Sequence, residues 1–266
     1  MNDFYRLTKA HRSIRKYKET PVADDVLKRV LQAATTASSS GNMQTYSIVV
    51  TKAAELKKRM FKPHFEQSMV IDAPVFLTFC ADFHRMRKWL ELSEAPDNFD
   101  NFISFMIATI DAVLASQSAA LAAESEGLGI CFLGTTLVSC NQISEILNCP
   151  QNVVPVVGFS LGYPAEEPAP RGRLPLEGVV HFETYKDYSD QATKNLYREK
   201  EITGMARYRE VPELKKMIEE AQISNLAQVY TKAKYTRESH IDYSSALLDC
   251  LKRKDFFSHE LKAEEK

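Results

Sequence analysis

The sequence has few of the features that mark secreted, metal-binding or nucleic-acid-binding proteins. Its five cysteines are odd in number and form neither a CxxC pair nor a zinc-ligand spacing. The six histidines show no metal spacing either, so we expect no metal site. Basic and acidic side chains nearly cancel, 34 against 35, which gives no reason to expect a nucleic-acid or acidic-membrane partner.

Targeting segments and membrane spans are also lacking by pattern. The opening residues, MNDFYRLTKAHRSIRKY, contain no apolar core of a signal peptide. The most apolar stretch, residues 102–123, is interrupted by Asp111, Ser116 and Gln117. Together with the cysteine pattern, these features predict a cytoplasmic protein that is neither exported nor inserted in a membrane.

The sequence does contain alternating helical and strand patterns, with 44% hydrophobic residues in a chain of 266, enough for a sizeable core. Thr20 and Pro21 are typical of a helix N-cap and a first helical residue, and predict a helix that starts there. Strands are predicted at residues 46–51, 75–80, 130–134 and 153–161, a long helix at 100–126 and a short one at 141–147.

The composition changes after a proline-rich connector, residues 164–175. Beyond residue 178, Gly204 is the one glycine and Pro212 the one proline. This last part of the chain is charged and helical by pattern. The order of elements predicts an α+β or α/β fold with a helical C-terminal extension.

Two cationic segments are candidates for binding a phosphate. Residues 11–16, HRSIRK, contain several basic side chains and a hydroxyl within six positions. Such groups can hold a phosphate through charge-assisted hydrogen bonds. In Arg171-Gly172-Arg173, the glycine lets the backbone come close to a ligand, and the flanking prolines restrict the loop. Taken alone, each segment also fits an ordinary exposed surface.

Residues 158–162, GFSLG, fit the GxSxG pattern of a serine hydrolase and offer an alternative function. That motif needs a helix directly after the serine. Ser160 is instead followed by Gly-Tyr-Pro-Ala, which blocks a helix, so the sequence disfavours a hydrolase that uses Ser160. A GxGxxG fingerprint after a strand is also absent, and this argues against a Rossmann unit for NAD(P)H.

Five segments in the same order resemble the nitroreductase family. They are HRSIRKY with the helix that follows it, SSSGNMQTYSIVV, Gln67 ahead of APVFLTFCAD, AAESEGLGICFLG, and RGRLP. The resemblance runs from about residue 4 to about residue 190, and is closest to the oxygen-insensitive nitroreductase and flavin reductase branch. It implies a homodimer of α+β subunits with a mixed, mainly antiparallel sheet. Residues 1–190 would form an FMN-binding domain, and residues 191–266 a helical extension packed on the same domain or on the partner subunit.

The resemblance also implies which residues bind FMN, one cofactor lying at each end of the subunit interface. His11, Arg12 and Ser13, together with Arg171 and Arg173, would hold the phosphate and the ribityl chain. Both subunits would contribute to each site, through a loop that reaches the partner's flavin and carries Ser39, Ser40, Asn42 and Gln44.

Other matching residues would surround the flavin ring. Arg15 would lie near the pyrimidine edge, where a fixed positive charge favours the reduced flavin. Gln67 would hydrogen-bond the same edge. Leu133, Gly134 and Thr135 match the segment whose backbone amides face flavin N5, and Thr135 stands where many relatives have a second glycine.

The implied activity is hydride transfer from NAD(P)H through flavin N5 to a small organic acceptor. The acceptor would be a nitroaromatic, a quinone or free flavin, reached by a ping-pong mechanism. The flavin performs the transfer, so no catalytic side chain is expected. The alternative is a non-catalytic protein that binds FMN or another phospho-ligand.

Overall fold

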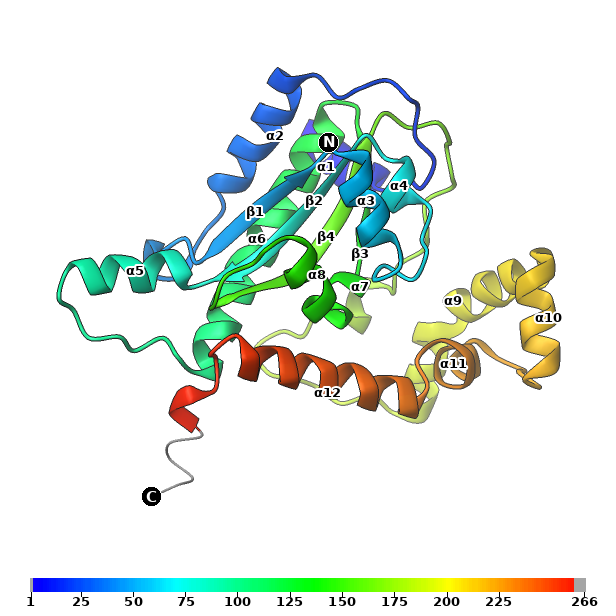
Figure 1. Cartoon of the computed structure of the whole chain (residues 1–266). Helices are drawn as coiled ribbons and strands as arrows, with labels where there is room; N and C mark the ends of the chain where they lie inside the picture. Colours follow the sequence, from blue (N-terminus) through cyan, green and yellow to red (C-terminus); the bar gives the residue numbers. More distant parts are fainter. Residues whose placement is uncertain (1, 261–266) are drawn as a thin grey trace. The chain divides into compact units, whose positions relative to one another are not determined.

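The computed structural model (Figure 1) describes residues 2–260. These residues form two compact units. The first contains the chain up to Ala169 together with the residues from Tyr243 onward, and the second contains Pro170–Asp242. Each unit is described by itself below.

The first unit is built on a four-stranded sheet in the order β1-β2-β4-β3, in which neighbouring strands are antiparallel. The strands are β1 (Tyr46–Thr51), β2 (Val75–Asp82), β3 (Gly129–Leu133) and β4 (Val153–Gly162). The four predicted strands are confirmed to within two residues at each end, and so is the α+β class. Every residue of β2 is buried, which explains why its sequence is apolar without alternation.

Helix α6 (Phe102–Ser125) is the long helix that the sequence predicts, and it packs along the sheet (Figure 1). Its N-cap, Asn101, accepts a hydrogen bond from the Ser104 N–H. Small alanines, among them Ala108, Ala112 and Ala115, let the helix lie close to the buried strands. Among the described residues, α6 is the one helix long and apolar enough to cross a membrane by length and composition, and 44% of that stretch is buried.

Helix α2 corrects one prediction. It spans Asp24–Thr35, and its N-cap is Ala23 rather than Thr20. The residues before it are held in an extended path, because the Lys18 N–H bonds the Tyr163 carbonyl at 2.9 Å. Asp24 and Asp25 in its first turn favour the later start, since negative charge stabilises a helix N-terminus.

The remaining helices of the first unit are short and surround the sheet. They are α1 (Asp3–Ala10), η1 (Ser40–Asn42), α3 (Ala54–Phe61), α4 (Met69–Asp72), α5 (His84–Leu92), α7 (Thr135–Val138) and α8 (Cys140–Ile146). The predicted helix at 141–147 corresponds to α8. Helix α12 (Arg237–Arg253) ends in this unit, and Cys250, Leu251 and Phe256 join its hydrophobic core.

The second unit is helical, as the composition of this part of the chain predicts. It contains η2 (Leu176–Gly178), α9 (Asp190–Glu210), α10 (Pro212–Glu220), α11 (Leu226–Gln228), η3 (Val229–Lys234) and the start of α12. A small core of its own includes Met205, Tyr208 and Ile218. The boundary at residue 190 and the packing of the extension stay predictions.

Candidate functional site

Residues 11–17 form an extended segment, here called the N-terminal strip, along the edge strand β3. Ser13 pairs with Ile130 in a parallel bridge, and the Ile14 N–H donates to the Ile130 carbonyl at 2.9 Å. Ile14 is buried above Gly129, where an added Cβ atom would lie 2.6 Å from Ile14 Cγ1. The strip is therefore fixed by one buried side chain, which leaves the half-buried side chains on either side of it for other partners.

Tyr17 anchors the far end of the strip. Its hydroxyl donates to the Ile14 carbonyl at 2.6 Å and lies 2.7 Å from Ser160 Oγ. Burial is the main cause that raises the pKa of Tyr17, so its hydroxyl stays protonated. Ser160 lies fully buried inside β4, not at a turn before a helix. The GxSxG pattern thus belongs to a strand whose Ser160 is hydrogen-bonded by Tyr17. It lacks the strand-to-helix turn that a hydrolase nucleophile requires.

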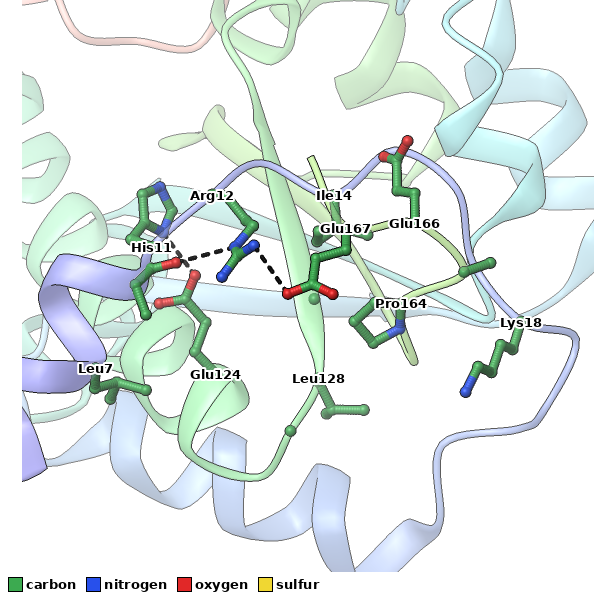
Figure 2. A pocket seen from close by; sticks show the side chains of 14 residues that line it. Leu7, His11, Arg12, Ile14, Lys18, Glu124, Leu128, Pro164, Glu166 and Glu167 are labelled. Carbon is green, nitrogen blue, oxygen red and sulfur yellow. Dashed lines mark hydrogen bonds and ion pairs between the residues drawn. The ribbon is translucent and has the colours of Figure 1, made fainter. Parts of the chain in front are cut away.

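Two basic residues at the start of the strip have acidic partners within the chain. His11 Nδ1 lies 2.6 Å from Glu124 Oε1, and Arg12 donates to Glu167 at 3.3 Å (Figure 2). Arg12 also donates to the Pro168 carbonyl at 3.2 Å. The side chain of Glu167 is 87% exposed, and an exposed ion pair contributes little free energy. Arg12 therefore remains able to bind another anion.

A pocket of about 660 Å³ borders this end of the strip (Figure 2), within the size range of small-molecule sites. Of the predicted cofactor residues, His11 and Arg12 line it. Its other charged walls come from Lys18, Glu124 and the acidic residues at 166–167. The pocket thus overlaps the predicted cofactor site only at His11 and Arg12. The other predicted cofactor residues do not line this pocket.

The backbone of the strip already holds one negative group. Glu166 Oε1 accepts hydrogen bonds from the Arg15 N–H at 2.6 Å and the Lys16 N–H at 3.1 Å. Successive backbone N–H groups that converge on one oxygen form a common site for anions and electron-rich oxygens. The sequence patterns did not single out Glu166. Its position in the connector that follows β4 is the one feature of the sequence that could have indicated this role.

At the other end of β3, the structure brings two predicted residues together. Thr135 Oγ1 lies 3.4 Å from Gln67 Nε2 and 2.8 Å from His64 Nδ1. His64 is fully buried, and desolvation lowers its pKa to about 4. Leu133 and Gly134 connect β3 to this cluster. Sequence reasoning missed His64, because a histidine without metal spacing gives no signal.

The predicted loop at residues 39–44 is organised by Asp111 of α6. The buried Asp111 carboxylate accepts hydrogen bonds from the Ser39 hydroxyl at 2.7 Å, the Ser40 N–H at 2.9 Å and the Thr45 hydroxyl at 2.8 Å. Burial, the largest single influence, raises the pKa of Asp111, but these hydrogen bonds together outweigh it and the net shift is downward. In the sequence, the one indication of this role is that Asp111 is a carboxylate within a largely apolar helix.

Two polar side chains of this loop lie on residues with left-handed backbone. Asn42 has φ 56° and Gln44 has φ 49°, a region that is costly for most residues and more accessible to asparagine. Gln44 Nε2 donates to Asn42 Oδ1 at 2.5 Å. These side chains are therefore held by a fixed turn.

The predicted cofactor residues form separate groups within one chain. The N-terminal strip and the cluster of Gln67 and Thr135 border β3, whereas the loop at 39–44 leads into β1, at the opposite edge of the sheet. Arg171 and Arg173 belong to the second unit, where Arg173 Nη1 donates to the Arg171 carbonyl at 3.4 Å. Their approach to Arg12 stays a prediction.

The fold and this site define an α+β protein with a cationic strip and a polar cluster at one sheet edge. Residues 8–163 match the model of the Nitroreductase family. The chain is 36% identical over 198 residues to the FMN reductase (NAD(P)H) of Bacillus subtilis (strain 168), covering 74% of this chain and 79% of that protein. The chain therefore belongs to the nitroreductase family.

Solved structures agree with this assignment. A Bacteroides fragilis NCTC 9343 protein described as an oxidoreductase superposes with a TM-score of 0.87 at 40% identity, over 95% of this chain and 100% of that one. The NADPH:FMN oxidoreductase of Vibrio harveyi complexed with NAD+ has a TM-score of 0.72 at 27% identity, over 92% and 98% of the two chains. The similarity thus extends into the helical C-terminal part.

Proposed function

We propose that this protein is an oxidoreductase that binds FMN and passes two electrons from NAD(P)H to a small organic acceptor. Its family and the names of its relatives support the general reaction. One observation carries the proposal: the strip, Gln67 and the Leu133–Thr135 segment, far apart in sequence, gather around β3. These segments are three of those that the family resemblance assigns to FMN.

The donor set of this edge fits FMN. His11, Arg12 and Ser13 supply donors for a phosphate. The N–H groups of Arg15 and Lys16, which hold the Glu166 carboxylate, suit an electron-rich oxygen such as a pyrimidine carbonyl. When bound, FMN supplies the redox chemistry by accepting a hydride from NAD(P)H and delivering it to the acceptor.

The protein's part in the reaction is to bind and to orient. The Arg15 guanidinium would supply a positive charge near the pyrimidine edge of the flavin, where negative charge gathers on reduction. Gln67 is held by its hydrogen bond to the His64 carbonyl at 3.0 Å, so its amide is fixed before a ligand arrives. Such preorganisation lowers the entropy cost of aligning the reactants.

We place a second copy of the chain against the outer face of α6. Apolar side chains on this face are exposed, with Ile103 at 63%, Ile110 at 51% and Val113 at 46%. They recur at helical spacing, and a continuous apolar stripe on a surface helix is typical of a subunit interface. The loop at 39–44 is fastened to the same helix by Asp111, and in this homodimer it would reach the partner's FMN.

In the proposed ping-pong reaction, NAD(P)H and the acceptor occupy the same place in turn. The sequence has no separate fingerprint for a dinucleotide, which supports one shared position. The acceptors we propose are nitroaromatics, quinones and free flavin, and the compartment is the cytoplasm. Residues 191–266 would form the extension that distinguishes this branch of the family.

The purified protein tests these proposals directly. We expect a yellow protein that releases FMN on denaturation and oxidises NAD(P)H when a nitroaromatic, a quinone or free flavin is present. Initial rates should give parallel double-reciprocal lines. A colourless protein that takes up no FMN would end the proposal, and an FMN-loaded protein without turnover would leave only the binding function. Intersecting lines would contradict the ping-pong order.

A further inference from the structure

The His64 ring has one nitrogen that is hydrogen-bonded and one that is not. Nδ1 lies 2.8 Å from Thr135 Oγ1, and the ring packs on Phe76 with centroids 5.0 Å apart. Within residues 2–260, Nε2 has no hydrogen-bond partner. Because desolvation lowers the pKa of His64 to about 4, the ring is neutral near pH 7 and carries a single N–H.

The proton of His64 belongs on Nδ1. A buried N–H without an acceptor is rarer than a buried lone pair without a donor. With the proton on Nδ1, His64 donates to Thr135 and leaves only a lone pair on Nε2. The opposite tautomer would bury an unpaired N–H beside Phe76.

Gln67 supplies a second donor to the same hydroxyl. Its Nε2 lies 3.0 Å from the His64 carbonyl and 3.4 Å from Thr135 Oγ1. The carbonyl is an acceptor, which identifies this atom of Gln67 as the nitrogen, and an amide nitrogen donates two hydrogens.

Both lone pairs of the Thr135 hydroxyl are therefore occupied, one by His64 and one by Gln67. A hydroxyl in this state can only donate its own proton. Among the described residues, no acceptor takes that proton. Thr135 is half-buried and directly follows the exposed Gly134 at the end of β3, in the segment that the proposed function assigns to the flavin.

We infer that the Thr135 hydroxyl donates a hydrogen bond to the O4 oxygen of the flavin, and that His64 and Gln67 are positioning residues that keep it a donor. This inference rests on the proposed function. A hydroxyl that can only donate needs a partner that accepts in both redox states. N5 gains a hydrogen on reduction, whereas O4 keeps its lone pairs. A donor at O4 draws electron density from the ring and so favours the reduced form.

The first arm of the test reads the network without any flavin. In protein labelled with 15N-histidine, the His64 signals should show a protonated Nδ1 and an unprotonated Nε2, and Thr135→Val should shift the Nδ1 signal. A wild-type ring protonated at Nε2 would overturn the inference.

The second arm measures the two-electron midpoint potential of bound FMN. We expect Thr135→Val to lower the affinity for reduced relative to oxidised FMN about fivefold, the size of one neutral hydrogen bond. That ratio corresponds to a potential about 20 mV lower for a two-electron couple. Thr135→Ser keeps the hydroxyl and should keep the wild-type potential. His64→Leu should lower the potential, and His64→Asn, which retains a donor nitrogen, should restore it.

The outcomes separate this inference from the proposed function. A purely structural role would weaken both redox forms of FMN equally and leave the potential of Thr135→Val unchanged, which would overturn the inference. A higher potential in that variant would also overturn it. If wild-type protein takes up no FMN, the proposed function fails and the inference fails with it, whatever tautomer the first arm finds.

Discussion

The Ser39 hydroxyl donates a hydrogen bond of 2.7 Å to the Asp111 carboxylate, which lies 72 positions along the chain. The same carboxylate accepts the N–H groups of Ser40 and Thr45. Because backbone N–H groups can only donate, an asparagine at 111 would turn its own N–H₂ toward at least one of them. We expect Asp111→Asn to lower the free energy of unfolding by about 1–3 kcal/mol and to weaken FMN retention.

Urea unfolding and the fluorescence of released FMN measure these two effects. Asp242→Asn, at an exposed carboxylate, is the matched control and should change neither quantity. Equal behaviour of the two variants would show that Asp111 does not organise the loop.

The close contact between Ile14 and Gly129 predicts a second effect. In Gly129→Ala, the new Cβ atom would lie 2.6 Å from Ile14 Cγ1, so the N-terminal strip must move away from β3. We expect a loss of about 1–3 kcal/mol in unfolding free energy, as for other overpacked sites. Gly134→Ala, where the added atom meets nothing within 4 Å, should change stability by less than about 0.5 kcal/mol. Similar losses in both variants would contradict the packing of the strip.

Burial of His64 predicts that stability depends on pH. Its folded pKa of about 4 lies below the ordinary value of 6.5, so between these values the unfolded state takes up a proton that the folded state does not. Stability therefore falls as the pH drops through this window, by about 2 kcal/mol from pH 7 to pH 5.

The comparison of variants isolates this contribution of His64. Urea unfolding of His64→Leu should show a pH dependence that is smaller by this amount, while His259→Gln, at an exposed position, should keep the wild-type dependence. An unchanged pH dependence in His64→Leu would mean that the buried ring is not the source.

The exposed apolar face of α6 predicts that a charge there prevents self-association. Ile110→Glu places a carboxylate in the proposed interface, and we expect association at least tenfold weaker, which is about 1.4 kcal/mol. Leu92→Glu on α5 is the control, because Leu92 is also exposed, at 85%, but lies outside α6. Sedimentation velocity distinguishes the species. A dimer that survives Ile110→Glu but not Leu92→Glu would move the interface to another surface.

The cationic end of the strip predicts unequal effects on FMN retention. Arg12→Ala removes a charged donor from the proposed phosphate site, and we expect the dissociation constant of FMN to rise about 10- to 150-fold, as hydrogen bonds to charged groups contribute about 1.5–3 kcal/mol. Arg173→Ala should act in the same direction. Arg207→Ala, in the last turn of α9, should have little effect in a fluorescence titration. Equal affinity in all three variants would show that the residue assignment is wrong.

The strands were predictable because local sequence determines them. Residues 46–51 and 75–80 combine β-branched and apolar side chains between polar boundaries, and both lie in the sheet. The start of α2 was not predictable from its local pattern. Thr20 and Pro21 fit a helix start, yet the hydrogen bond from Lys18 to Tyr163 holds the preceding chain extended. A tertiary contact therefore overrides a local preference.

The site shows the same division between local and long-range information. The family pattern singled out Gln67 and Thr135, which the structure places 3.4 Å apart at their polar atoms. It did not reveal His64, which bonds Thr135 across 71 positions, or the Glu166 carboxylate, which bonds Arg15 across 151. Such pairings depend on the order of strands in the sheet, so a periodic pattern along the chain carries no trace of them.

The placement of the N-terminal strip and the Asp111-anchored loop at opposite edges of one sheet has a thermodynamic consequence in the proposed homodimer. A cofactor that touches both subunits binds the associated form and not the separated one, and at 100 times its dissociation constant it stabilises that form by about 2.7 kcal/mol per site. Flavin supply and subunit association are thereby linked. Scarcity of FMN would increase the fraction of separated chains, and dilution of the protein would release the flavin.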